Sequence, residues 1–190
     1  NGMAGVACVE EILRYAPPFD ITIFGDQTHV NYNRILLSSV LAGERAADDI
    51  TLNPPGWYTR NGIDLQVGVR VASVDADART VTAEDGRVMP FDVLLLATGS
   101  SAWMPPIAGI GTPGVFAFRT LDDTRALLDR ARPGARAVVI GGGLLGLEAA
   151  RGLQVQGCEV TVVHLMDRLM ERQLDGVAGA YLASRMEALG

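Results

Sequence analysis

The chain has 190 residues, which suits one domain or two small ones, and 48% of them are hydrophobic, so it can form a buried core. Its formal net charge of −6 argues against tight nucleic-acid binding, which requires clustered Lys and Arg. No stretch approaches the roughly 18 consecutive apolar residues of a membrane span, and residues 1–5 do not resemble the start of a signal peptide. We therefore expect a cytoplasmic protein that binds neither nucleic acid nor membrane.

The first 43 residues predict a helix, a strand and a second helix. Apolar residues have helical spacing over residues 6–15, and Pro17 and Pro18 are expected to end that helix. A β-branched and aromatic run at residues 21–24 predicts a buried strand. Residues 31–41 are predicted to form the second helix, with Gly43 as its C-terminal cap.

Residues 67–96 predict a β-meander inserted into this α/β pattern. Short strands of alternating polarity are separated by turns at residues 75–78 and 84–87, and the second turn contains the Asp-Gly pair typical of hairpins. A continuous apolar run at residues 93–96 predicts a buried strand, which leads directly into Ala97-Thr98-Gly99.

A second α/β unit is predicted from about residue 120 onward. Thr120 is the expected N-cap of a helix that runs to about residue 131, and Asp123 completes a weak capping-box pattern. The elements that follow are a strand at 137–140, a helix at 144–156 closed by Gly157, a strand at 159–164 and a helix at about 176–189.

The motif G-x-G-x-x-G occupies residues 141–146, between a predicted strand and a predicted helix. Gly141 permits a tight turn, Gly143 lets the backbone approach a pyrophosphate, and Gly146 lets the helix pack close to the strand. The free N–H groups and the positive end of the helix would then hold the phosphates. We assign nucleotide binding to Gly141, Gly143, Leu144, Leu145 and Gly146; the alternative is a glycine turn that only packs.

At the end of the next predicted strand, His164 stands where a carboxylate usually binds the adenosine ribose of NAD. A neutral imidazole neither binds the 2′-OH as a carboxylate does nor repels the 2′-phosphate of NADP. Arg168 and Arg172 could pair with that phosphate or lie in solvent, whereas Asp167 would repel it. We expect His164 to contact the nucleotide, with weak discrimination in favour of NADH.

A truncated copy of the same motif opens the chain. Gly2 and Gly5 match its last two glycines, with Asn1 as the variable residue before them. Asp26 lies 21 residues beyond Gly5, just after a predicted strand, where a carboxylate on an adenosine ribose is expected; the alternative is a surface turn. Arg34 could bind the pyrophosphate with its guanidinium fork or be a solvated helix residue.

The Ala97-Thr98-Gly99 segment, placed between a β-meander and a second glycine motif, resembles the pyridine-nucleotide-disulfide oxidoreductase superfamily. The resemblance implies an α/β fold of two Rossmann-like units, the first with the inserted β-meander. It implies an FAD-binding domain at residues 1–117, without its first strand and returning C-terminal segment, and an incomplete NAD(P)H-binding domain at residues 118–190. It also places Ala97, Thr98 and Gly99 near FAD, together with Asn33 and Val71.

Within that superfamily, residues 31–39, the second glycine motif and residues 169–175 resemble the large subunit of assimilatory NAD(P)H-dependent nitrite reductases. The resemblance implies hydride transfer from NAD(P)H to FAD and single-electron transfer onward to an acceptor. In that family the electrons pass through iron–sulfur clusters to sirohaem, where nitrite becomes ammonium. This chain has no Cys cluster for such groups, so we expect them only in the remainder of a longer protein and expect no metal site here. A homodimer is one possible assembly.

Two alternatives remain open. Disulfide reductases carry a Cys-x4-Cys pair where this chain has only Cys8, and other relatives place a redox cysteine within residues 36–39, where none is present. We therefore expect no thiol chemistry from Cys8 or Cys158, and no catalytic residue is assigned. Ferredoxin and rubredoxin reductases commonly have a lysine where Ser39 stands, so a stand-alone reductase of a small carrier fits less well. A slow flavin-dependent redox sensor is the second alternative.

Overall fold

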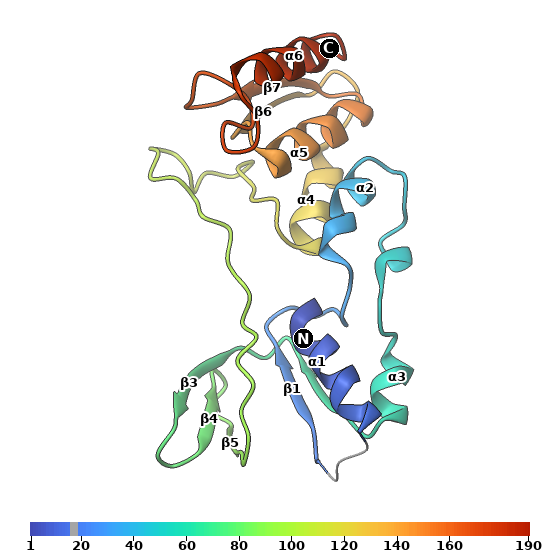
Figure 1. Cartoon of the computed structure of the whole chain (residues 1–190), viewed down its shortest axis with the longest axis vertical. Coiled ribbons are helices and arrows are strands. Elements are labelled where there is room, and N and C mark those ends of the chain that lie inside the picture. Colours follow the sequence, from blue (N-terminus) through green and yellow to red (C-terminus); the bar gives the residue numbers. More distant parts are fainter. Residues whose placement is uncertain (16–18) are drawn as a thin grey trace. The chain divides into compact units, whose positions relative to one another are not determined.

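The computed structural model describes residues 1–15 and 19–190, which separate into two compact units (Figure 1). The first unit contains Asn1–Asn33 and Ile50–Ser100, and the second contains Arg34–Asp49 and Ser101–Gly190. Each unit pairs a glycine turn and helix with parallel strands, which confirms the α/β class and the two Rossmann-like units. Compactness does not show which cofactor a unit binds, so the assignment of residues 1–117 to FAD and 118–190 to NAD(P)H stays a prediction.

The first unit is built around two parallel strands and two helices. Strand β1 (Thr22–Gly25) pairs with β2 (Asp64–Val67), and the helices are α1 (Met3–Arg14) and α3 (Pro55–Arg60). The predicted first helix is confirmed, although its expected end at Pro17 and Pro18 lies outside the described residues. The core of the unit joins one buried residue from α1, one from α3 and one just before β2, namely Val9, Tyr58 and Ile63.

The predicted β-meander is confirmed. It consists of β3 (Val71–Asp75), β4 (Thr80–Ala83) and β5 (Val88–Pro90), which form an antiparallel sheet in chain order. In the first turn, the carboxylate of Asp75 accepts a hydrogen bond of 2.8 Å from the N–H of Ala78. In the second, Gly86 has a φ of 86°, which a residue with a side chain rarely adopts.

The predicted strand at residues 93–96 is wrong. Within the part of the chain that the structure describes, this segment forms no ladder with any strand, and Val93 and Leu96 are 78% and 68% exposed. An apolar run favours burial and an extended backbone, but a strand also requires a hydrogen-bonded neighbour. No neighbour pairs with this run among the described residues, and the apolar pattern by itself could not reveal that.

The predicted helix at residues 31–41 is correct only in its second half. Tyr32 forms an isolated antiparallel bridge with Thr51, and the N–H of Asn33 donates to the carbonyl of Ile50 at 2.8 Å. The backbone groups of residues 31–33 are thus hydrogen-bonded to residues 50–52, so they cannot form the hydrogen bonds of a helix. A 3-10 turn, η1 (Arg34–Leu36), and helix α2 (Leu37–Leu41) follow, and Gly43 with a φ of 74° ends the helix as predicted. A further 3-10 turn, η2 (Asp48–Ile50), precedes α3.

The second unit follows the predicted order closely. It contains α4 (Leu121–Arg130), β6 (Arg136–Ile140), α5 (Leu144–Val155), β7 (Glu159–Val163) and α6 (Gly176–Glu187), with β6 and β7 parallel. The capping box is confirmed. The Thr120 hydroxyl accepts from the N–H of Asp123 at 3.1 Å, and the Asp123 carboxylate accepts from the N–H of Thr120 at 2.8 Å.

Helix α2 contributes to the core of the second unit, although it precedes the β-meander in sequence. Leu41 is fully buried and packs with Ala149 and Leu153 of α5 and with Cys158. Gly152 makes this approach possible, because a Cβ there would lie 2.7 Å from Cγ of Leu41. The unit therefore combines two segments that are distant along the chain, which sequence periodicity alone does not reveal.

Candidate functional site

The first glycine turn leaves an open backbone surface at the start of α1. Gly2 is the N-cap residue of this helix, and no heavy atom lies within 4 Å of the position that a Cβ on Gly2 would take. Gly5 is different, because its added Cβ would lie 3.3 Å from Cβ of Ala97. The first N–H groups of a helix lack intrahelical partners and carry a partial positive charge. This turn can therefore receive a phosphate at Gly2, while Gly5 lets the helix approach the Ala97 segment.

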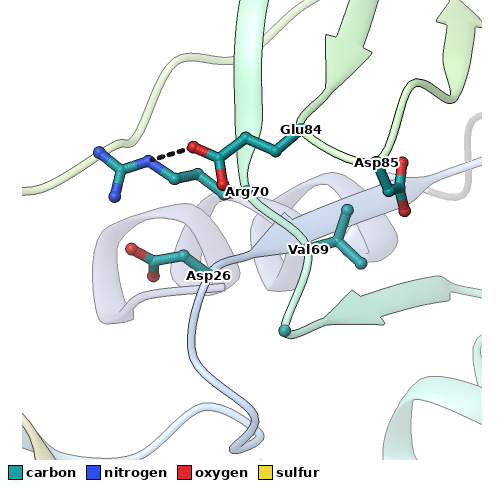
Figure 2. A pocket seen from close by; sticks show the side chains of 6 residues that line it. Asp26, Val69, Arg70, Glu84 and Asp85 are labelled. Carbon is teal, nitrogen blue, oxygen red and sulfur yellow. Dashed lines mark ion pairs between the residues drawn. The ribbon is translucent and has the colours of Figure 1, made fainter.

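Asp26 lines a pocket of about 330 Å³ at the carboxyl ends of the parallel strands β1 and β2 (Figure 2). Its neighbours come from the segment after β2 and from the turn after β4, and they are Gly68, Val69, Arg70, Glu84 and Asp85. Two backbone hydrogen bonds of 2.9 Å hold the wall in place, from the N–H of Gly68 to Gln27 and from the N–H of Val69 to Gly25. Parallel α/β sheets bind ligands at this end of the strands.

The charges of this pocket leave Asp26 as its available carboxylate. Arg70 pairs with Glu84 at 3.4 Å, as Figure 2 shows. Arg87 pairs with Asp85 at 2.8 Å, and its hydrogen bonds hold the pKa of that carboxyl below its ordinary value. Within residues 1–15 and 19–190, Asp26 has no ion-pair partner. Its carboxylate can accept hydrogen bonds from hydroxyl groups of a ligand.

The other predicted residues of the first site are placed as follows. Val71 begins β3 directly after the pocket residue Arg70. Thr98 and Gly99 are exposed and follow Ala97, and Gly99 has a φ of 70°. Asn33 belongs to the first unit, whereas Arg34 belongs to the second, where it begins η1. The structure thus brings Gly5 and Ala97 together.

In the second glycine turn, the three glycines of the motif differ in their surroundings. Gly141 follows β6 with a φ of 122°, a conformation that favours glycine. A Cβ on Gly146 would overlap the carbonyl oxygen of Gly141, so the helix can approach the turn only with glycine there. Gly143 is the N-cap residue of α5 and has open space beside it. Leu144 and Leu145 are exposed in the first helical turn, where their N–H groups lack intrahelical partners.

His164 contacts this turn directly. The N–H of Gly142 donates to Nδ1 of His164 at 3.0 Å, and Nε2 of His164 lies 3.1 Å from the carboxylate of Glu171. The N–H of Met170 also donates to the carbonyl of Gly142 at 2.9 Å. The N–H of Glu171 and the His164 imidazole hold the pKa of the Glu171 carboxyl below its ordinary value. The segment after β7 therefore packs against the glycine turn and is held there by the hydrogen bonds that His164 and Met170 form with Gly142.

The Arg168 side chain binds neighbouring residues of the loop after β7. Its guanidinium donates to the carbonyls of Leu174 and Glu171 at 3.2 and 3.4 Å and pairs with Asp167 at 3.2 Å. Arg172 is 87% exposed and lies 4.0 Å from Glu171. Of the two arginines that the sequence offers for a 2′-phosphate, one is thus engaged by protein groups and the other extends into solvent.

Sequence reasoning missed the pocket wall around Asp26 and the role of Glu171. The wall depends on the parallel pairing of β1 with β2, which places residues 68–70 beside Asp26. Glu171 lies seven residues beyond His164, and no periodic pattern predicts that the two side chains meet. The available signal was the presence of acidic residues in the loop that follows the strand after the glycine motif.

Several other features bear on the sequence predictions. Cys8 and Cys158 are both free thiols, and Cys158 is buried. Within residues 1–15 and 19–190, no group of three or more His, Cys, Asp or Glu side chains could hold a metal ion. Over the same residues, every helix is too short or too polar to cross a membrane.

Two glycine turns, each followed by a helix and set at the carboxyl end of a parallel strand pair, define a dinucleotide-binding α/β protein. The family model described as pyridine nucleotide-disulphide oxidoreductase matches residues 1–190. The chain therefore belongs to the pyridine nucleotide-disulphide oxidoreductase family, which confirms the resemblance inferred from its motifs.

Three relatives illustrate this membership. The chain is 51% identical to nitrite reductase [NAD(P)H] and 48% identical to the assimilatory nitrate reductase electron transfer subunit, both of Bacillus subtilis (strain 168), over its whole length. It spans about a quarter of those proteins, 24% and 25% respectively. The crystal structure of the covalent putidaredoxin reductase–putidaredoxin complex gives a TM-score of 0.90 at 31% identity and covers 100% of this chain and 46% of that one.

Proposed function

We propose that the first unit holds FAD, that the second holds NAD(P)H, and that the protein passes hydride from NAD(P)H to the flavin and electrons to an acceptor. The observation that carries this proposal is the pair of glycine turns, one in each unit, each with an open N-cap glycine at Gly2 and Gly143. A single turn would serve one nucleotide, whereas a reductase of this kind must hold two. The family membership supports the same conclusion.

The residues of the first unit fit the FAD molecule. Gly2 offers an uncovered backbone at a helix start, which suits a pyrophosphate. Asp26 offers an ionisable carboxylate in a pocket, which suits the hydroxyls of a ribose. We assign the remaining contacts with FAD to Gly5 and Ala97, which pack against each other beside the turn. Further contacts are assigned to five residues predicted from the sequence, namely Asn33, Arg34, Val71, Thr98 and Gly99.

The flavin, when bound, supplies hydride acceptance and one-electron donation. The residues of this chain supply binding and orientation. In the second unit, the N–H groups of Gly143, Leu144 and Leu145 bind the pyrophosphate of NAD(P)H, while Gly141 and Gly146 shape the turn that presents them. His164 lies beside this turn, on the side where the adenosine ribose belongs.

Among possible acceptors, we favour the iron–sulfur and sirohaem groups of a nitrite reductase, so that this chain is the diaphorase part of an enzyme that reduces nitrite to ammonium. The 51% identity to a nitrite reductase over the whole chain supports this choice. The 48% identity to an assimilatory nitrate reductase electron transfer subunit favours a second candidate, in which the electrons go to a separate nitrate-reducing protein. The similarity to the crystal structure of the putidaredoxin reductase–putidaredoxin complex supports a small carrier protein as a third candidate acceptor.

The test uses the full-length protein. We expect a flavin absorption spectrum, oxidation of NADH or NADPH with an artificial acceptor, and nitrite-dependent oxidation that yields ammonium. Activity with the artificial acceptor but none with nitrite would reject the nitrite reductase assignment, and addition of a nitrate reductase catalytic protein would then test the second candidate. Absence of flavin would contradict the FAD site itself. Sedimentation of the same sample tests the homodimer, which stays a prediction.

A further inference from the structure

The segment after β7 brings a carboxylate to the place where the sequence has none. At the end of this strand the ribose-binding position holds His164, whose imidazole is only 16% exposed. Glu171 approaches from the following loop and places Oε2 at 3.1 Å from Nε2 of His164. The acidic group is thus one hydrogen bond away from the position that a ribose-binding carboxylate would occupy.

The hydrogen bonds determine how this pair is arranged. Nδ1 of His164 accepts the N–H of Gly142, so in the neutral ring the proton must lie on Nε2. Nε2 then donates to the carboxylate of Glu171. The chain of donors therefore runs from the glycine turn through His164 to Glu171, and it leaves the carboxylate charged and oriented beside the turn.

The loop that carries Glu171 is held at both ends. The N–H of Met170 donates to the carbonyl of Gly142 at 2.9 Å, and Met170 adopts a φ of 51°, which is uncommon for a residue with a long side chain. Beyond Glu171, the carbonyl of Leu174 accepts a hydrogen bond of 3.2 Å from Nε of Arg168, and the N–H of Leu174 donates to the carbonyl of Met170 at 2.9 Å. A carboxylate on such a loop is positioned before a ligand arrives.

Of the two arginines on this loop, Arg172 lies 4.0 Å from the Glu171 carboxylate, but its side chain is 87% exposed and its charge is screened by solvent. The guanidinium of Arg168 donates to the carbonyls of Leu174 and Glu171 within its own segment. A phosphate at the 2′ position would therefore meet the Glu171 carboxylate, and close like charges repel strongly where water is partly excluded.

We infer that Glu171 is the specificity-determining residue of the second unit: its carboxylate binds the adenosine 2′-OH of NADH and disfavours the 2′-phosphate of NADPH, and His164 acts as the residue that positions it. This inference rests on the proposed NAD(P)H site. It moves the ribose contact from His164 to Glu171 and predicts a stronger preference for NADH than His164 alone would give.

The experiment measures binding of two probes, ADP-ribose and 2′-phospho-ADP-ribose, which differ only in the 2′-phosphate. Isothermal titration calorimetry on the full-length protein gives the dissociation constant of 2′-phospho-ADP-ribose divided by that of ADP-ribose. The wild-type protein is expected to bind ADP-ribose more tightly. Glu171→Gln keeps the side-chain size but removes the charge, and it should reduce this ratio by about tenfold or more.

Glu159→Gln is the matched control, because it makes the same substitution at an exposed residue that begins β7, at the opposite end of the strand from His164. It should leave the ratio within about twofold, since exposed charges are screened by salt. His164→Ala should lower the ratio as Glu171→Gln does, and the double variant should change it no further, because the two residues act through one contact. Glu171→Asp, which keeps the charge on a shorter side chain, is a second variant if Glu171→Gln does not fold.

The outcomes separate the inference from the proposed function. An unchanged ratio in folded Glu171→Gln, or an equal change in Glu159→Gln, would overturn the role of Glu171. Failure of the wild-type protein to bind either probe would instead reject the NAD(P)H site of the second unit, and the inference with it.

Discussion

Gly5 and Ala97 stand so close that a Cβ added to Gly5 would lie 3.3 Å from Cβ of Ala97. Carbon atoms in comfortable contact are about 3.5–4.0 Å apart, so this approach leaves no room for a larger side chain. The contact joins the first turn of α1 to the Ala97-Thr98-Gly99 segment, although more than 90 residues separate them. Two motifs identified independently in the sequence therefore lie side by side in the first unit.

Gly5→Val should reduce the flavin content of the full-length protein. The branched side chain must push α1 away from Ala97, which displaces the helix start that we assign to the pyrophosphate. The measurement is flavin absorbance per mole of purified protein, with circular dichroism to show that the variant is folded. Gly176→Ala is the control, because a Cβ on Gly176 meets nothing within 4 Å. A folded Gly5→Val variant with full flavin content would contradict the assignment.

The second glycine turn allows a sharper comparison. Gly146→Ala should lower the melting temperature, because its Cβ would overlap the carbonyl oxygen of Gly141. Gly143→Ala should leave the melting temperature nearly unchanged, because the space beside Gly143 is open, but should weaken NADH binding by blocking the approach of the pyrophosphate. Thermal melting and NADH titration on both variants check this. If Gly143→Ala binds NADH as tightly as the wild type does, the phosphate does not lie against Gly143.

Tyr58→Phe should destabilise the protein by about 1–3 kcal/mol, because it leaves the buried N–H of Asn31 without its acceptor. The Tyr58 hydroxyl accepts that N–H at 3.2 Å and donates to the side chain of Asn1 at 3.1 Å. Denaturant unfolding of the full-length protein at neutral pH measures the difference. A variant as stable as the wild type would show that the two hydrogen bonds contribute nothing.

The same residue predicts a pH effect. Burial raises the pKa of the Tyr58 hydroxyl above its ordinary value of about 10. The folded state therefore holds this proton more tightly than the unfolded state, so the stabilisation is complete below about pH 10 and is lost as pH rises through the folded-state pKa. Wild-type stability should consequently fall more steeply above pH 10 than that of Tyr58→Phe. Parallel slopes for the two proteins would argue against the shift.

Replacement of both cysteines should leave electron transfer intact. Cys158 is buried against the core of the second unit, and both thiols are free. A double variant, Cys8→Ser with Cys158→Ala, is expected to oxidise NADH with an artificial acceptor within about tenfold of the wild-type rate, which corresponds to less than about 1.4 kcal/mol of barrier. A larger loss in a protein that retains its flavin and its melting temperature would show that a thiol takes part.

Predictions from the sequence were most accurate where the structure is local. The helix start at Thr120 and the glycine turn at residues 141–146 depend on residues within one turn of each other, and both are confirmed. The predicted strand at residues 93–96 and the first half of the predicted helix at residues 31–41 failed, because both depend on partners far along the chain.

The sequence by itself therefore determined the order of the elements, the places where glycine is required and the membership of a dinucleotide-binding family. Only the tertiary structure decided that Asp26 lines a pocket with the residues that follow β2 and that Leu41 packs against Gly152. It also decided that Glu171 forms a hydrogen bond with His164. The physical reason is that helix caps and tight turns are stabilised by neighbours in sequence. Side-chain hydrogen bonds and core contacts instead depend on which distant segments meet once the chain has folded.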